Sequence, residues 1–293
     1  MPYHLLLDIS SLMYRAFFAL PPSLSSAEGR PVNALRGYLD MAARLQHDLH
    51  PDDAIHVYDH DWRPAQRVAA YAGYKAQRPP EPEGLSEQFE LLREVLDAFG
   101  VRQADAPGWE ADDAIGTLCT QQPGTRFDIV TGDRDLLQLV RDEGTAGPGS
   151  DAVRVLFTVK GVSELVVFDR ATVLARYGVA PERYVDFAAL RGDPSDGLPG
   201  VKGVGDKTAR ALVDRYATLD ALLEDLDAQP PRLRASLEAA RSYLEAMPQV
   251  VPIRRDVSVR VFSEQHDAAR LDDLASRYNL KGPVRRLREA LEA

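Results

Sequence analysis

Residues 3–8 carry the sequence YHLLLD, a short apolar run that ends in an aspartate. The pattern returns at residues 53–59 (DAIHVYD) and 126–133 (RFDIVTGD). Such runs predict strands that are buried on both faces, as in a parallel sheet. Segments with the apolar periodicity of helices lie between and beside them, at 32–49, 85–99 and 110–121. This alternation predicts an α/β core in which the three terminal aspartates meet at the carboxyl edge of the sheet, where such folds bind their ligands.

The composition is that of a folded protein. The chain has 293 residues, of which 45% are hydrophobic and 27% charged, enough for one large domain or two ordinary ones. The single cysteine, Cys119, has no partner for an internal disulfide, which favours a reducing compartment. Apolar runs fall far short of the roughly 20 residues of a membrane helix, and charges interrupt the apolar N-terminus. We therefore expect a soluble cytoplasmic protein without a membrane partner.

Beyond about residue 170 the strand patterns give way to helical ones. The predicted helices span 169–177, 181–190, 207–216, 219–226 and 232–247. An extended return to the sheet is expected at 250–262, before closing helices at 268–279 and 283–291. These patterns predict an α/β core at 1–168, a helical subdomain at 169–249, and a return strand with C-terminal helices that pack on the core at 250–293.

Residues 62–84 predict an excursion from the core. Four cations and no acid occupy residues 62–80, namely Arg63, Arg67, Lys75 and Arg78. A proline-rich stretch, RPPEPEG, ends the segment at 78–84. Proline and unpaired charge are typical of segments that leave the packed core and carry function.

Nine acidic residues fall in compact groups, which are Asp8, Asp59, Glu110, Asp112, Asp113, Asp133, Asp135, Asp193 and Asp196. A helix N-terminus, a tight turn and a loop would each explain one group alone. Convergence of the groups at one sheet edge instead favours a site for Mg²⁺ or Mn²⁺, which prefer oxygen ligands. At 3.6 residues per turn, Glu110 and Asp113 should project outward from the same helix face.

These nine acids also account for the net charge. The chain has 35 basic and 45 acidic residues, a balance of −10 that would argue against a polyanionic partner. Without the nine acids, 36 acidic residues face 35 basic ones. The acidic balance therefore does not exclude nucleic acid as a ligand.

The stretch LPGVKGVGDKT at 198–208, called the hairpin below, predicts a phosphate-binding turn. Gly200, Gly203 and Gly205 permit close approach of a backbone, and Lys202 and Lys207 flank the start of a helix. The order G-x-x-G-x-G is neither a Rossmann nor a Walker fingerprint, which disfavours a nucleotide cofactor. A turn of this kind contacts phosphates and makes no sequence-specific contacts to base edges. An ordinary glycine-rich connection between helices is the alternative.

Five sequence segments together resemble the flap endonuclease family and the 5′-nuclease domain of bacterial DNA polymerase I. They are LLLDISSLMYRAFFA, VYDHDWRPAQRVAAYAGYKAQRPP, GWEADDAIGTL, IVTGDRDLLQLV and LRGDPSDGLPGVKGVGDKTARALV, in this order. The resemblance implies a PIN-like parallel-sheet core, a helical arch at about 62–84, and a helix-three-turn-helix DNA-binding element at 193–216. It implies a metal-dependent 5′-3′ exonuclease and flap endonuclease that acts in replication and repair.

The resemblance also implies roles for individual residues. The nine acids would bind two or more Mg²⁺ or Mn²⁺ ions, and Lys75, Arg78 and Arg15 would contact the scissile phosphate. The residues expected to bind DNA are Gly200, Val201, Lys202, Gly203, Val204, Gly205, Lys207 and Tyr74. Apart from the resemblance, Tyr71, Tyr74 and Trp62 are aromatic residues among the arch cations, which makes each a candidate to stack on a displaced base. A K⁺ ion at the hairpin carbonyls around Val201 and Val204 is a further expectation.

Branched or 5′-flap DNA, including 5′ strands that contain RNA, is the expected partner of a monomeric, nucleoid-associated protein. Two other functions stay open, a catalytically silent junction-binding protein and a PIN-type ribonuclease. The first would have lost carboxylates, and the second would lack the hairpin. The chain matches a stand-alone enzyme, although a piece of a longer polymerase would carry the same motifs. A basic C-terminal run, Arg277, Lys281, Arg285, Arg286 and Arg288, is either a solvated helix face or a DNA contact.

Overall fold

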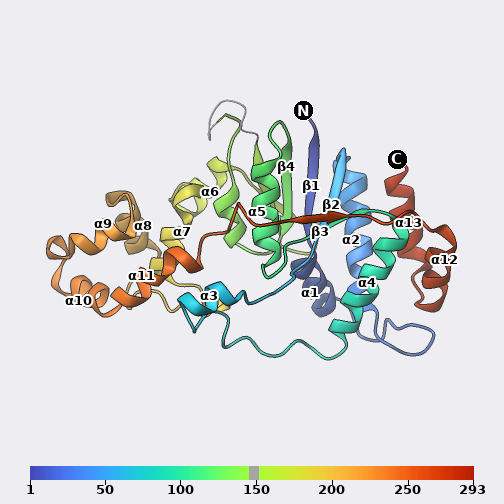
Figure 1. Cartoon of the computed structure of the whole chain (residues 1–293), viewed down its shortest axis with the longest axis horizontal. Coiled ribbons are helices and arrows are strands. Elements are labelled where there is room, and N and C mark those ends of the chain that lie inside the picture. The colour runs from blue at the N-terminus through green and yellow to red at the C-terminus, as the bar shows by residue number, and fades with distance from the viewer. Residues whose placement is uncertain (145–151) are drawn as a thin grey trace.

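The computed structural model describes residues 1–144 and 152–293. The described residues form a seven-stranded sheet with the order β6-β5-β4-β1-β2-β3-β7 (Figure 1). Its strands are β1 (Tyr3–Asp8), β2 (Asp53–Val57), β3 (Arg102–Asp105), β4 (Arg126–Thr131), β5 (Val153–Thr158), β6 (Leu165–Phe168) and β7 (Arg260–Phe262). The inner strands run parallel, and β6 and β7 pair antiparallel at the two edges. The predicted α/β class is confirmed.

The three runs that end in aspartate form β1, β2 and β4, as predicted. The predictions missed β3, β5 and β6. The sequence of β3 is RQAD, and its Gln103 and Asp105 are buried because they have partners inside the protein. Gln103 accepts a hydrogen bond of 2.9 Å from the Tyr58 hydroxyl, and Asp105 accepts two of 2.7 Å from Arg260. Apolar periodicity cannot reveal a strand whose polar groups are satisfied in this way.

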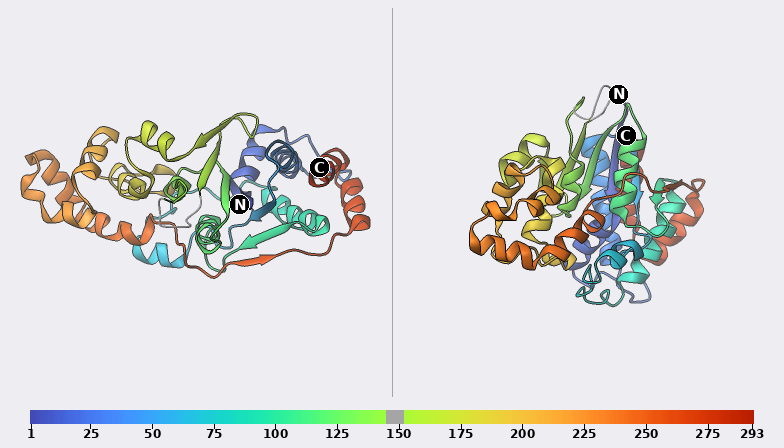
Figure 2. Two further views of the ribbon diagram at one scale, coloured as in Figure 1. Left: turned by 90° about the horizontal axis from the view of Figure 1, so that it is seen from above. Right: turned by 60° about the vertical axis from the view of Figure 1, so that its left-hand side comes forward.

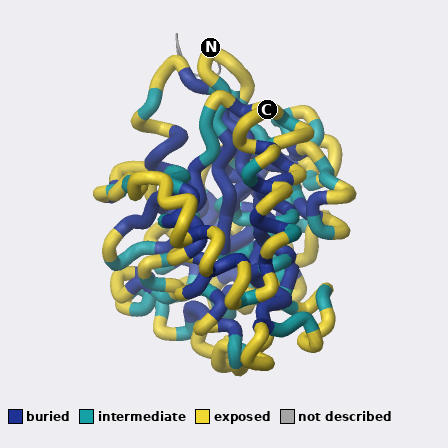
Figure 3. The backbone as a smooth tube through the Cα atoms, turned by 90° about the vertical axis from the view of Figure 1, so that its right-hand side faces the viewer, coloured by how far each residue is buried: buried dark blue, intermediate teal, exposed yellow. Residues whose placement is uncertain are grey.

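Helices cover both faces of the sheet. Leu5 and Leu7 of β1 pack with α1 (Ile9–Ala19), α2 (Asn33–Leu49) and α4 (Leu85–Phe99). Leu6 points to the other face and packs with α5 (Ala111–Gln121) and the helical elements that follow β6. The alternation follows from the two-residue period of a strand. Figure 3 shows the buried strands, in dark blue, running through the middle of the molecule.

The helical elements after β6 gather at one end of an elongated molecule, and the C-terminal helices lie at the other end (Figure 2). The first group comprises α6 (Arg170–Tyr177), α7 (Tyr184–Arg191), α8 (Asp206–Arg215), α9 (Leu219–Glu224), α10 (Pro231–Ala239) and α11 (Arg241–Val250). The single helix predicted at 232–247 is therefore two, because Ala240 takes a non-helical backbone conformation. At this break Arg241 turns back to donate a 3.0 Å hydrogen bond to the carbonyl of Leu223 in α9. A tertiary contact thus overrides the local helical pattern.

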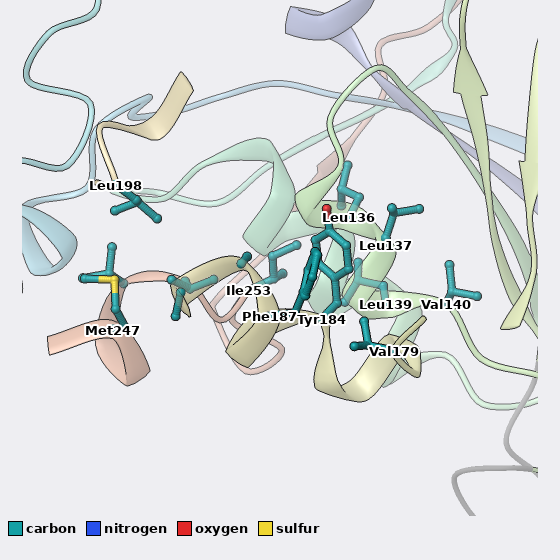
Figure 4. Packing of buried hydrophobic residues seen from close by; sticks show 14 of the residues in the cluster. Leu136, Leu137, Leu139, Val140, Val179, Tyr184, Phe187, Leu198, Met247 and Ile253 are labelled. Carbon is teal, nitrogen blue, oxygen red and sulfur yellow. The ribbon is translucent and has the colours of Figure 1, made fainter. Parts of the chain in front are cut away.

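The helical group shares its core with the sheet. The 3-10 helix η1 (Asp135–Leu139) follows β4, and its Leu136 and Leu137 belong to the same buried cluster as Tyr184 and Phe187 of α7. Figure 4 shows these side chains beside one another, with Met247 of α11 on the far side of α7. This cluster connects the sheet edge to the helices that carry the glycine-rich hairpin.

The chain returns to the sheet over a shorter stretch than predicted, since within 250–262 only β7 is a strand. Two helices, α12 (Ala268–Arg277) and α13 (Lys281–Leu291), then pack on α4 and α2. Four arginines of the basic run have acidic partners. Arg277 pairs with Glu28, Arg285 with Glu289, Arg286 with Asp40 and Arg288 with Asp272. This pairing favours a solvated helix face over a DNA contact.

None of the described helices has the length and apolar character needed to cross a membrane.

The hairpin depends on a glycine that approaches another backbone closely. Gly200 has a φ of 65°, and a methyl group on it would lie 2.5 Å from the carbonyl carbon and oxygen of Arg191. Gly203 also has a positive φ, of 80°, but a methyl group there would have nothing within 4 Å. Substitution of Gly203 therefore tests the cost of the positive φ alone, and substitution of Gly200 tests that cost together with a steric clash.

We predict that Gly203→Ala costs about 1–2 kcal/mol of unfolding free energy, the usual penalty of a left-handed conformation. Gly200→Ala should cost clearly more, because side-chain rotation cannot relieve a clash with backbone atoms. Urea denaturation followed by circular dichroism measures both values. Equal losses in the two variants would contradict the close approach at Gly200.

Candidate active site

The carboxyl ends of β1, β2 and β4 bring Asp8, Asp59 and Asp133 to one edge of the sheet, as predicted from their sequence pattern. Asp8 caps α1 by accepting a 3.1 Å hydrogen bond from the Ser11 amide. It also accepts a 2.6 Å bond from the Thr131 hydroxyl at the end of β4. Asp8 is thereby held between two neighbouring strands.

Asp59 joins the ends of two helices. One carboxylate oxygen accepts a 2.5 Å hydrogen bond from the Ser10 hydroxyl at the start of α1. The other accepts a 2.7 Å bond from the Ala111 amide at the start of α5. The beginning of α5 is therefore fixed against the end of β2, which places its acidic first turn at the same sheet edge.

The first turn of α5 differs from the prediction. Glu110 is the N-cap of the helix, and Asp113 accepts a hydrogen bond from the Glu110 amide in a reciprocal capping arrangement. Both side chains are almost completely buried, so they do not project outward into solvent. The reason is that cations from residues 62–84 cover them.

Arg67, on α3 (Ala65–Ala70), is the principal cation at this position. Its guanidinium is buried and binds the carboxylate of Asp113 with two hydrogen bonds of 2.7 and 2.8 Å. It also forms an ion pair with Glu110. Further bonds of 3.0 and 3.2 Å reach the carbonyls of Val250, at the end of α11, and of Pro252 just beyond it. Arg67 had no assigned role in the sequence predictions, although the acid-free stretch at 62–80 contained it.

Lys75 and Arg78 contact carboxylates instead of lying free for a phosphate. Lys75 is buried, with a φ of 50°, and forms an ion pair with Glu110. Arg78 donates a 2.8 Å hydrogen bond to Asp196, and the Lys75 amide donates one of 2.9 Å to the Asp196 carbonyl. The turn that carries both cations is thus docked on η3 (Pro194–Asp196) at the entry to the hairpin. Within 62–84 the only helix is α3, so the arch is helical over a short part of its length.

The structure corrects the expectation for Tyr74. This ring was predicted to stack on DNA, but only 4% of the residue is exposed. Its hydroxyl donates a 2.7 Å hydrogen bond to Glu110, and Lys75 lies 5.0 Å above the ring centre. Tyr74 therefore supports the buried ion pairs and has no free face for a base in this structure.

The remaining carboxylates lie in two turns, one with Asp133 and Asp135 after β4 and one with Asp193 and Asp196 at η3. The Asp133 carboxylate accepts a 2.8 Å hydrogen bond from the Asp135 amide, which fixes the turn after β4. Asp193 caps η3 with a 2.9 Å bond from the Ser195 amide. Arg67, Tyr74, Asp112, Asp135 and Asp196 line one narrow recess, closed by Leu198, Val250, Val251 and Ile253. The recess brings acids from α5, η1 and η3 together.

The electrostatics divide the acids into two sets. Burial, followed by the charge of Asp59, raises the pKa of Asp8 to about 7. Burial and neighbouring carboxylates also raise the pKa values of Asp112, Asp133 and Asp135. Burial acts in the same direction on Glu110, but Lys75 and Arg67 outweigh it and lower the pKa of that carboxyl. At Asp113 burial outweighs Arg67, so the pKa of that carboxyl is raised as well. Glu110 and Asp113 thus have cationic partners from residues 62–84, whereas Asp8, Asp112, Asp133 and Asp135 form a self-repelling set.

The self-repelling set fits a divalent cation. Its donors are carboxylate oxygens, which suit hard ions such as Mg²⁺ and Mn²⁺. No group of three or more His, Cys, Asp or Glu side chains in residues 1–144 and 152–293 has the arrangement of a metal site. The ion pairs of Glu110, Asp113 and Asp196 account for part of this, because cations of the arch occupy these oxygens.

The hairpin lies next to η3. Lys202 and Lys207 are exposed on either side of Gly205, which is the N-cap of α8. The side chains of Val201 and Val204 are buried, and the Val201 amide donates a 2.9 Å bond to the Leu190 carbonyl. Arg15 is partly buried and donates a 2.9 Å bond to the Val159 carbonyl. The exposed residues of the hairpin are Lys202 and Lys207, the glycines Gly203 and Gly205, and also Pro199 and Asp206.

The fold and the carboxylate site together define a nuclease with its acidic centre at the edge of a parallel sheet. A model described as "5′-3′ exonuclease, N-terminal resolvase-like domain" matches residues 3–178. A second, described as "5′-3′ exonuclease, C-terminal SAM fold", matches residues 179–273. The chain belongs to the 5′-3′ exonuclease family, which confirms the predicted resemblance and the class of structure-specific 5′ nuclease.

Similar proteins agree with this assignment. A 5′-3′ exonuclease of Mycobacterium tuberculosis is 39% identical, over 98% of this chain and 97% of that protein. DNA polymerase I of Mycobacterium bovis is 40% identical over 87% of this chain, a match that covers 28% of the polymerase. Among solved structures, the flap endonuclease of bacteriophage T5 in complex with DNA and metal ions has a TM-score of 0.64 and 17% identity, and the match covers 99% of this chain and 98% of that one. The last similarity shows a shared fold.

The raised pKa of Asp8 leads to a prediction about stability. The ordinary pKa of an aspartate is near 3.9 and that of folded Asp8 is about 7, so the folded chain binds more protons between these values. Its unfolding free energy should therefore fall as the pH rises through this window. In the presence of a chelator, urea denaturation at pH 5.5 and 7.5 should show this loss. Asp8→Asn removes one of the titrating groups and should reduce the dependence without abolishing it, because Asp112, Asp133 and Asp135 also have raised pKa values. Equal slopes in the two proteins would contradict the assignment.

Proposed function

We propose that this 5′ nuclease uses Mg²⁺ or Mn²⁺ to hydrolyse DNA phosphodiesters at junctions between single strands and duplex. It acts as a 5′-3′ exonuclease and flap endonuclease on branched or 5′-flap DNA, including 5′ strands that contain RNA. One observation carries this proposal: acids from three strand ends and from the start of α5 gather beside a glycine-rich hairpin with two exposed lysines. The carboxylates proposed to support hydrolysis thus lie next to the hairpin proposed to bind the DNA backbone.

Asp8, Asp112, Asp133 and Asp135 are the residues best suited to hold the ions, since burial and mutual repulsion raise their pKa values. The other predicted ligands, Asp59, Glu110, Asp113, Asp193 and Asp196, complete or orient this set. When bound, such ions supply an activated water and stabilise the leaving oxygen. Thr131 and Ser10 orient Asp8 and Asp59 by donating hydrogen bonds, so the protein positions the donors before any ion arrives.

Lys75, Arg78 and Arg15 are proposed to contact the scissile phosphate. Lys75 and Arg78 bind Glu110 and Asp196 in the described structure, so they must exchange these partners for a phosphate. Glu110 and Asp196 would then need another positive partner, which a bound divalent ion would supply. Exposed Arg78 has the shorter path to a phosphate, whereas buried Lys75 needs the turn around it to move.

The hairpin is proposed to bind the duplex backbone through Gly200, Val201, Lys202, Gly203, Val204, Gly205 and Lys207. The exposed lysines support phosphate contacts without base readout, so sequence specificity is not expected. Carbonyls around Val201 and Val204 remain the proposed site of a K⁺ ion. We retain the division into parts at 1–168, 169–249 and 250–293 as a proposal.

The other candidate functions have less support. A silent junction-binding protein should have lost some of the nine acids, and all are present. A PIN-type ribonuclease would lack the hairpin. We further propose that the protein is a monomer. It would meet its DNA substrate in the cytoplasm, in association with the nucleoid.

Asp133→Asn should abolish cleavage of a labelled 5′-flap substrate in Mg²⁺ or Mn²⁺ while leaving its binding intact. The change removes a metal ligand but not the basic surfaces. Gel-based cleavage and fluorescence anisotropy of the same DNA separate the two effects, with urea denaturation as the check of folding. Parallel loss of binding and cleavage in a folded variant would argue against the assignment of Asp133.

Lys75→Ala should lower the single-turnover rate more than the affinity, because a cation near the scissile phosphate acts as charge develops. By analogy with loss of one oxyanion donor, the cost is about 2–4 kcal/mol of transition-state stabilisation. Lys160→Ala is the matched control, since Lys160 is an exposed lysine paired with Glu164. Equal and modest changes of rate and affinity would make Lys75 an ordinary backbone contact.

A further inference from the structure

Trp62 is an exposed aromatic residue beside the carboxylate site. Half of its surface, 50%, is accessible, although large apolar side chains usually bury theirs. It begins the arch segment, three residues after Asp59, and three residues of chain span at most about 11 Å. The backbone of Trp62 therefore lies within about 11 Å of that of Asp59, at the edge of the site.

The other aromatic residues of segment 62–84 are already engaged. Tyr74 is buried against Glu110, Lys75 and Arg67. Tyr71 is partly buried and meets Tyr243 edge to face, with 5.7 Å between the ring centres. Trp62 has no ring or cation–π contact with the described residues. Of the three, it alone offers an open ring face.

Hydrogen bonds on both sides hold the backbone around Trp62. The amides of His60 and Asp61 donate to the Trp109 carbonyl, at 3.2 and 3.0 Å, next to the start of α5. On the other side, the Arg63 side chain donates to the carbonyls of Tyr74 and Ala72, at 2.7 and 2.9 Å. The indole is thus presented from a fixed platform, which limits the conformational entropy that binding would cost.

The surroundings favour a nucleobase over an apolar protein surface as the ligand. Arg67, Lys75 and Arg78 have carboxylate partners, but the guanidinium of Arg63, the residue next to Trp62, donates to carbonyls and keeps its positive charge beside the ring. Unpaired nucleic acid binds where a cation accompanies an exposed aromatic ring. Such stacking tolerates any base, in keeping with the absence of base readout expected at the hairpin.

We propose that Trp62 is a substrate-binding residue that stacks on an unpaired nucleobase of the 5′ strand beside the scissile phosphate. This inference rests on the proposed function and deepens it. The hairpin holds the duplex side of the junction, and Trp62 holds the single-stranded side. Its ring contributes to the choice of junction DNA over plain duplex.

The chain has two tryptophans, so fluorescence can isolate Trp62. In an Asp133→Asn, Trp109→Phe protein, Trp62 is the only tryptophan and cleavage is blocked. Emission should be quenched when 5′-flap DNA binds, and the quenching should disappear when the unpaired nucleotides next to the junction are abasic. Anisotropy of labelled DNA records binding in the same samples. Unchanged emission with bound, intact flap would overturn the proposal.

Affinity provides the second measurement, with Asp133→Asn as the common background. Trp62→Ala should weaken flap binding about 5- to 100-fold, as expected for loss of one stacked base. Trp62→Phe should restore most of it, and affinity for plain duplex should not change. The matched control is Leu174→Ala, which removes an apolar side chain of similar exposure, 51%, on α6. Equal weakening for flap and duplex would overturn the role of Trp62, whereas failure of the otherwise unmutated chain to bind or cleave flap DNA would reject the proposed function itself.

Discussion

The ion pairs of Arg67 hold together three parts of the chain that meet at the carboxylates. Its guanidinium links α3 to the first turn of α5 through Asp113 and Glu110, and to the end of α11 through the Val250 carbonyl. With Lys75, two buried cations face two buried carboxylates, so the group is electrically balanced. Balance is required here, because removing one partner of a buried pair typically costs about 3–5 kcal/mol. The shape of the site follows from where these four charges must lie.

The same balance explains why the acids do not behave alike. Glu110, Asp113 and Asp196 have cationic partners from the protein. For Asp8, Asp112, Asp133 and Asp135, burial and the charges of neighbouring carboxylates raise the pKa. Those four would therefore gain most from an added cation. The arch residues couple the two sets, since any movement of Lys75 or Arg78 toward a phosphate exposes carboxylates that an ion can then reach.

The sequence predicted what depends on local pattern. The strands β1, β2 and β4, their terminal aspartates and the glycine-rich hairpin are short continuous segments, and the structure contains each of them. Sequence patterns could not predict contacts between segments that are far apart in the chain. Tyr74 looked like a free aromatic ring because nothing nearby in the sequence indicates that Glu110, 36 residues away, accepts its hydrogen bond. The outward orientation expected for Glu110 and Asp113 failed for the same reason, because Arg67 reaches both from 43 and 46 residues away.

The hairpin and the carboxylates have a fixed spacing, because one buried cluster runs between them. Leu136 and Leu137 follow Asp135 directly, and they lie beside Phe187 of α7 (Figure 4). Val201 of the hairpin belongs to the same buried cluster. A packed interior of this kind resists deformation, so the hairpin with its exposed Lys202 and Lys207 stays at a set distance from the acids. The arch, by contrast, is joined to the acids by ion pairs and hydrogen bonds that a substrate phosphate and divalent ions can replace. Under the proposed function, the hairpin would hold the duplex at a fixed distance from the acids, and the arch would exchange its ion pairs for contacts with the reacting strand.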